Sequence, residues 1–79
     1  MKEEEIKSRV ENIFRKMFSG VSQIEMNTSS KDVKGWDSLR HFILITEIEK
    51  EFQIGFELDE ILSMTTFGEI CEGVKRSLS

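Results

Sequence analysis

The chain has 79 residues, of which 38% are hydrophobic and 33% charged, and it contains no proline and no tyrosine. A chain of this length builds at most one small domain of modest stability, which we expect to span residues 1–79. The net charge of −4 disfavours binding to nucleic acid and to anionic membranes.

The first predicted element is a helix over residues 3–18. Apolar residues recur there at helical spacing and gather on one face, whereas charged and polar residues cover the remainder. Gly20 follows the pattern and is a plausible end signal. The apolar positions are Ile6, Val10, Ile13, Phe14 and Met17.

Residues 21–37 show no periodicity and are predicted to form a long loop. Turn-forming residues cluster at 27–32, and Gly35 adds a further break. Loops of this length are usually functional or disordered. Because Ile24, Met26, Val33 and Trp36 offer apolar anchors, we expect this loop to wrap the core.

A second helix is predicted from Asp37 or Ser38, both good N-cap residues, to about Phe52. Its apolar residues fall on two opposite faces. One face carries Leu44, Ile45, Ile48 and Phe52, with His41 among them, and the other carries Leu39, Phe42 and Ile43.

The second apolar face predicts a docking surface, because a helix in a small bundle needs only one apolar stripe toward the core. The charged residues that flank it are Arg40, Glu47, Glu49 and Lys50. The alternative is that this helix is sandwiched between others and that Phe42 belongs to the core.

An extended connector follows, in which Ile54 and Phe56 are expected to point inward, and Asp59 then caps a single turn at residues 60–62. The last helix starts near Thr66, which has the spacing of a capping box with Glu69. Together the elements predict an all-α fold with three longer helices, one short helix and a long first loop. The expected core includes Ile13, Phe14, Ile48, Phe52, Ile70 and Val74.

Ser38 lies where the long loop meets the second helix. A side chain at this point is exposed, and the first-turn N–H groups and the positive end of the helix dipole favour an anion beside it. A phosphodiester on Ser38 would therefore lie in a suitable field. Taken alone, Asp-Ser-Leu before a helix indicates only an N-cap.

The surrounding sequence is more specific. Residues 35–52, which run from Gly-Trp-Asp-Ser-Leu through aliphatic residues to an acidic stretch closed by Phe52, closely resemble the second helix of acyl and peptidyl carrier proteins. The resemblance extends to residues 54–56, to residues 65–67 and to the long first loop, so it covers essentially the whole chain.

The resemblance implies a small four-helix bundle, one acyl-carrier-type domain with no catalytic residue of its own. It implies that the Ser38 hydroxyl, flanked by Asp37 and Leu39, receives 4′-phosphopantetheine from coenzyme A through a separate phosphopantetheinyl transferase, which uses its own Mg²⁺. The thiol of the arm then holds acyl groups as thioesters for acyl-activating, condensing or transferring enzymes. The family's bundle can also shelter an acyl chain, which Ile45, Ile48 and Ile70 would line here.

The second helix departs from fatty-acid carriers, which place carboxylates along it for basic partner surfaces. At matching positions this chain has Arg40, Ile43 and Lys50, whereas Asp37, Glu49 and Glu51 remain acidic. These departures argue against ordinary fatty-acid synthase partners and favour polyketide, nonribosomal-peptide or other specialised pathways. The partner-binding residues expected on this helix are Leu39, Arg40, Phe42, Ile43, Glu47 and Glu49.

Two functions of other classes compete with that of a carrier. Ser38 and His41 lie three residues apart, a spacing that would suit a nucleophile and its base, but no second histidine and no evident oxyanion hole accompany them. A helical interaction module without the arm would keep the fold and the apolar face, although the intact motif around Ser38 argues against it. Within the carrier class, an aminoacyl or peptidyl carrier remains the alternative.

Several features are expected to be absent. Cys71 is the only cysteine, so it forms no internal disulfide and is interpreted as a small core residue; with His41 alone it makes no zinc site. No apolar run is long enough to cross a bilayer, and the acidic N-terminus lacks the apolar core of a signal peptide. We therefore expect a cytoplasmic monomer that does not insert into membranes.

Overall fold

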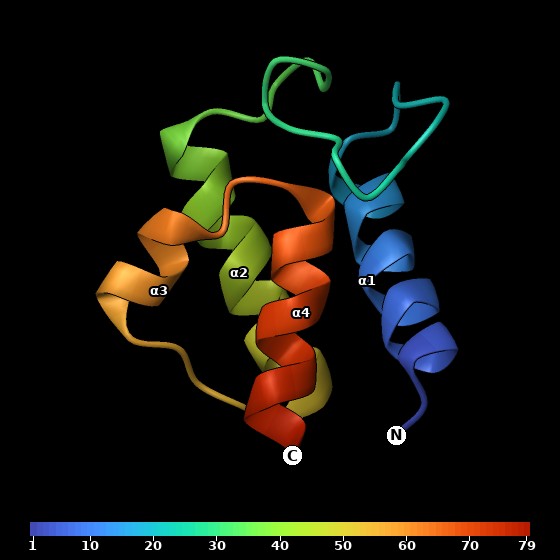
Figure 1. The fold of residues 1–79 in the computed structure, drawn as a ribbon. Helices are drawn as coiled ribbons and strands as arrows, with labels where there is room; N and C mark the ends of the chain where they lie inside the picture. The colour runs from blue at the N-terminus through green and yellow to red at the C-terminus, as the bar shows by residue number, and fades with distance from the viewer.

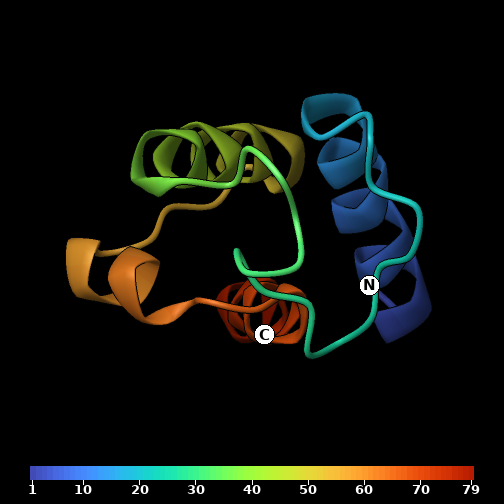
Figure 2. The same ribbon diagram turned by 90° about the horizontal axis from the view of Figure 1, so that it is seen from above.

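The computed structural model describes residues 1–79 and confirms the predicted all-α fold. Helix α1 spans Glu3–Met17, α2 Ser38–Phe52, α3 Leu58–Ser63 and α4 Phe67–Leu78. Figures 1 and 2 show α2 and α4 between α1 on one side and the short α3 on the other. None of these helices combines the length and the apolar character that crossing a membrane requires.

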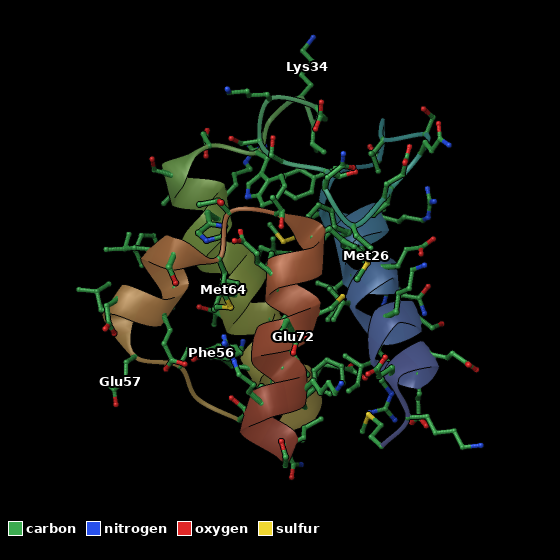
Figure 3. All side chains as sticks on the ribbon, in the orientation of Figure 1. Met26, Lys34, Phe56, Glu57, Met64 and Glu72 are labelled. Atoms are coloured by element: carbon green, nitrogen blue, oxygen red, sulfur yellow. The ribbon has the colours of Figure 1, made fainter.

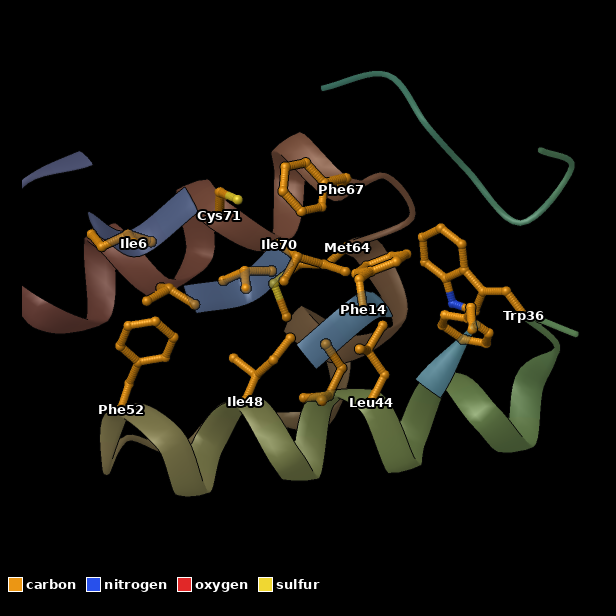
Figure 4. Close-up of a cluster of buried hydrophobic side chains, with 14 of the residues drawn as sticks. Ile6, Phe14, Trp36, Leu44, Ile48, Phe52, Met64, Phe67, Ile70 and Cys71 are labelled. Carbon is orange, nitrogen blue, oxygen red and sulfur yellow. The ribbon is translucent and has the colours of Figure 1, made fainter. Parts of the chain in front are cut away.

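The core forms where the apolar faces of the three long helices meet (Figure 4). Five of the six predicted core residues are buried, namely Phe14, Ile48, Phe52, Ile70 and Val74. The prediction was wrong for Ile13, which is only partly buried. Ile13 lies with Met17 along a shallow depression that Glu47 and Lys50 of α2 share, so solvent reaches this edge of α1.

The long loop crosses over one end of the bundle, as Figure 2 shows from above. Val33 and Trp36 are buried, and the Trp36 ring packs edge-on against the ring of Phe14 with 5.0 Å between the ring centroids. These contacts confirm that the loop wraps the core. Met26 was wrongly expected as an apolar anchor, because its side chain is 52% exposed. The backbone docks instead: the carbonyl oxygens of Met26 and Thr28 accept hydrogen bonds from the first-turn N–H groups of α4.

The ends of α1 and α3 differ from the prediction. The C-cap of α1 is Phe18 rather than Gly20, because the buried Phe18 ring packs against Phe14 and turns the chain inward at that point. Helix α3 is longer than the predicted single turn, and Asp59 does not cap it. Glu57 is the N-cap, and its backbone N–H donates a hydrogen bond of 2.9 Å to the Glu60 carboxylate.

The connector between α2 and α3 and the start of α4 follow the prediction more closely. Ile54 and Phe56 are half-buried against the core (Phe56 is labelled in Figure 3). The Thr66 side chain caps α4 and forms the predicted capping box with Glu69. These contacts place the beginning of α4 beside the loop and beside the beginning of α2, so three segments meet at one end of the bundle.

Candidate functional site

The three residues ahead of α2 set the position of Ser38. Gly35 has a φ of +93°, a left-handed conformation that favours glycine, and it lies in a turn closed by a hydrogen bond from Trp36 N–H to the Val33 carbonyl. Trp36 then enters the core, and Asp37 returns to the surface as the N-cap of α2. Ser38 follows as the exposed first residue of the helix.

Capping of α2 falls to Asp37 and not to Ser38. The Asp37 carboxylate accepts a hydrogen bond of 2.8 Å from the backbone N–H of Arg40. The Ser38 hydroxyl is therefore free of the role that an N-cap serine normally performs. An anionic group on its oxygen would lie at the positive end of a 15-residue helix.

Ser38 borders a groove of about 360 Å³ that opens to solvent. Ser30 of the loop, Phe42 of α2, Leu62 of α3 and Thr65 ahead of α4 contribute to its walls. The backbone N–H and the hydroxyl of Thr65 donate hydrogen bonds to Glu69, and these bonds lower the pKa of that carboxyl. Thr65 is thus fixed in place, and the groove offers mixed apolar and hydroxyl-bearing surface.

One residue beside the groove has a role that sequence reasoning missed. The His41 ring stacks on Trp36 and makes hydrogen-bonding contacts with the Trp36 indole and with the Ile61 carbonyl of α3. The prediction placed His41 among the apolar residues on one face of the second helix and assigned it no contact with Trp36 or with α3. Its single signal in the sequence was the spacing of one tryptophan and one histidine five residues apart.

The outer face of α2 is exposed as predicted. Leu39, Phe42 and Ile43 are 70%, 39% and 45% exposed, so Phe42 is not a fully buried core residue. Leu62 of α3 shares the groove wall with Phe42 and is itself exposed, which extends the apolar surface onto α3. This surface lies on the same end of the molecule as Ser38.

The predicted charged partner residues differ in their surroundings. The guanidinium of Arg40 lies against the loop at Gly35 and makes no ion pair within 4.0 Å. Glu47 pairs with Lys50 across 3.5 Å of exposed surface. Glu49 is half-buried and accepts a hydrogen bond of 2.8 Å from the Phe56 N–H, so it holds the connector; its role in partner binding stays a prediction.

Comparison with known proteins identifies the family. A scan against protein-family models and a search of curated proteins each returned no match. Among solved structures, the chain is similar to the solution NMR structure of a holo acyl carrier protein from Geobacter metallireducens, with a TM-score of 0.82. The two sequences are 31% identical, and the match covers 92% of this chain and 85% of the other. Because the likeness includes sequence as well as fold and covers most of both chains, this chain belongs to the acyl carrier protein family.

Proposed function

We propose that this protein carries acyl intermediates as thioesters on a 4′-phosphopantetheine arm attached to Ser38, for fatty-acid, polyketide or related specialised biosynthesis. The observation that carries the proposal is that Asp37, and not Ser38, caps α2. The Ser38 hydroxyl therefore makes no capping hydrogen bond and lies beside a groove. Membership of the acyl carrier protein family and the holo form of the Geobacter metallireducens protein support it.

The residues around Ser38 fit the proposed group. The phosphodiester would meet the first-turn N–H groups of α2, and Asp37 and Leu39 flank the attachment point. Attachment would replace the serine O–H bond by an O–P bond. The pyrophosphate bond of coenzyme A would break, 3′,5′-ADP would leave, and the proton would pass to a base on the transferase. When bound, the arm supplies a thiol that holds acyl groups in activated form.

The chain's own residues position and present the cargo in this proposal, and they do not transform it. We therefore propose a monomeric carrier domain over residues 1–79 that has no catalytic residue. Its partners would be a phosphopantetheinyl transferase and acyl-activating, condensing or transferring enzymes. These partners would approach the end of the molecule that carries Ser38 and the exposed face of α2.

The surroundings of the α2 carboxylates favour a specialised pathway. Asp37 caps the helix, Glu49 holds Phe56, and Glu51 lies 3.6 Å from Arg9 of α1. Glu47 is paired with Lys50, while Leu39 and Ile43 project outward. A partner with a strongly basic surface would find few unengaged carboxylates along this helix, whereas an apolar partner surface would match it.

The mass of the intact protein tests the attachment. Incubation with coenzyme A and a broad-specificity phosphopantetheinyl transferase should add the mass of one phosphopantetheine to the wild-type chain and none to Ser38→Ala. Ser30→Ala is the matched control, because Ser30 borders the same groove and should leave the modification intact. Modification of Ser38→Ala would refute the assigned site.

The exposed apolar face of α2 favours one second candidate, a module that docks partners without an arm. A wild-type chain that folds but gains no mass with several transferases would support that candidate. If the arm attaches, loading assays with acyl and aminoacyl donors separate an acyl carrier from an aminoacyl or peptidyl carrier.

A further inference from the structure

The imidazole of His41 connects three segments of the chain. Its Nδ1 lies 3.0 Å from the indole Nε1 of Trp36, at the end of the long loop. Its Nε2 lies 2.9 Å from the carbonyl oxygen of Ile61, twenty residues further along in α3. The ring also stacks on Trp36, with 5.9 Å between the ring centroids and 30° between the planes.

These contacts define one protonation state of the ring. An indole N–H only donates, so Nδ1 of His41 must accept and carries no proton. A carbonyl oxygen only accepts, so Nε2 must carry the proton and donate it to Ile61. Both bonds therefore form together only in the neutral ring that is protonated at Nε2.

Helix α3 depends on this contact more than the other helices do. It has six residues and buries none of them fully. The Ile61 carbonyl lies in the last turn of α3, where carbonyl groups lack partners within the helix. The N–H four residues further on, which would bind this carbonyl if the helix continued, belongs to Thr65 and donates to Glu69 instead. His41 thus supplies the partner that the end of α3 would otherwise take from water.

We propose that His41 is a positioning residue that latches α3 to α2 and to the long loop, and so holds the groove beside Ser38 closed toward the core. When the latch is released, α3 moves away from α2, and the groove extends past Leu62 toward Ile45 and Ile48. The consequence for cargo rests on the proposed function, because it requires an acyl group on an arm at Ser38.

The tautomer of His41 tests the latch in the unaltered protein. The chain has one histidine and one tryptophan, so ¹⁵N NMR spectra of the imidazole and of the indole are free of overlap. At neutral pH we expect the Nε2-protonated tautomer and an indole N–H protected from exchange with solvent. A ring protonated at Nδ1, or an indole N–H that exchanges freely, would overturn the proposal.

Hydrogen exchange tests whether the latch holds α3. His41→Phe keeps an aromatic ring against Trp36 and removes both bonds. We expect amides of α3 and of Met64 to exchange about tenfold faster or more, while the slowest amides of α1 and α4 keep their rates. The control is Thr46→Val, which removes a bond from the Thr46 hydroxyl to the Phe42 carbonyl on the outer side of α2 and should leave α3 unchanged. Unchanged exchange in α3, or equal acceleration in every helix, would contradict the latch.

An acyl-loaded form tests the consequence for cargo. With an octanoyl group on the arm, methyl resonances of Ile45 and Ile48 should shift more in His41→Phe than in the wild type, relative to the acetyl forms, because opening α3 costs less without the latch. Equal shifts in both proteins would refute the role in admitting cargo. If Ser38 accepts no arm, the proposed function fails by the mass measurement, whereas the exchange result still decides the latch.

Discussion

At the residue scale, Cys71 shows how burial alters the chemistry of a side chain that the proposed carrier function does not use. It is 8% exposed and lies among the apolar residues of the core. Burial raises the pKa of its thiol to about 11, and the nearby Lys7 only partly opposes this effect. The structure confirms the interpretation of Cys71 as a small core residue.

The raised pKa makes folding stability dependent on alkaline pH. Above about pH 9, the unfolded chain releases the thiol proton while the folded chain retains it, so the free energy of unfolding should fall as the pH rises through about 11. The loss should reach about 2 kcal/mol near the upper value. Chemical denaturation at several pH values measures it, and Cys71→Ala serves as the control, which should lack this part of the decline. Parallel pH profiles for the two proteins would contradict the prediction.

At the scale of elements, the contact between the long loop and α4 requires glycine at position 68. The N–H of Gly68 donates a hydrogen bond of 2.8 Å to the Met26 carbonyl. A Cβ atom at this position would lie 2.7 Å from that oxygen and 3.2 Å from the Met26 Cβ. These atoms belong to the backbone of Met26 and to its Cβ, so a change of side-chain rotamer cannot move them away.

Gly68→Ala should therefore destabilise the protein, although glycine to alanine in a helix usually stabilises by about 1 kcal/mol. We expect a loss of roughly 1–2 kcal/mol, because the loop must shift and weaken its bonds to the first turn of α4. Urea unfolding checks this, with Gly20→Ala as the control, since a Cβ there meets no atom within 4 Å. A variant more stable than the wild type would show that the loop adapts at little cost.

The same contact explains which elements could be predicted from the sequence. The long helices follow from side-chain periodicity, and the start of α4 follows from the spacing of Thr66 and Glu69. The docking of the loop could not be predicted, because the backbone carbonyls of Met26 and Thr28 make it, and backbone groups leave no pattern in the residue types. Helix α3 was mispredicted because its N-cap is Glu57, a residue uncommon at N-caps, whose backbone N–H is bound by the Glu60 carboxylate.

At the scale of the whole molecule, one residue of the candidate site could be predicted from the sequence, whereas the contacts of another could not. Ser38 was predicted as the attachment point from a local motif, since the turn, the cap and the helix start follow one another in the chain. The role of His41 joins a loop tryptophan to a carbonyl in α3, and this pairing exists only once the helices have packed. Sequence reasoning therefore predicted the proposed attachment point at Ser38, but it could not predict the contacts of His41 beside the groove.

The small core makes the stability of the molecule sensitive to single aromatic side chains. Phe52 is 6% exposed at the end of α2, and the guanidinium of Arg9 lies 5.7 Å from its ring centroid. Phe52→Ala should lower the free energy of unfolding by about 3–5 kcal/mol, which is close to the whole stability of so small a protein. Thermal and urea unfolding measure the loss. Phe42→Ala makes the same change on the same helix at a side chain that is 39% exposed, so it should cost much less; equal losses would contradict this assignment of the core.

The outer face of α2 decides, in our proposal, which enzymes this carrier meets. Ile43 is 45% exposed and lies on the side of α2 opposite the buried Leu44, Ile45 and Ile48. Ile43→Glu introduces the carboxylate that fatty-acid carriers place there, and it removes apolar surface worth about 25 cal/mol per Å² when a partner buries it. The free energy of unfolding of the variant should lie within about 0.5 kcal/mol of that of the wild type, because surface substitutions seldom change stability more.

Acyl transfer from this variant by the carrier's own partner enzymes should fall several-fold, and acceptance by fatty-acid synthase enzymes should improve. Ser8→Glu on the exposed side of α1 changes the net charge equally and should alter neither rate. A large loss of stability would place Ile43 within the bundle, and unchanged transfer would remove this face from the partner surface.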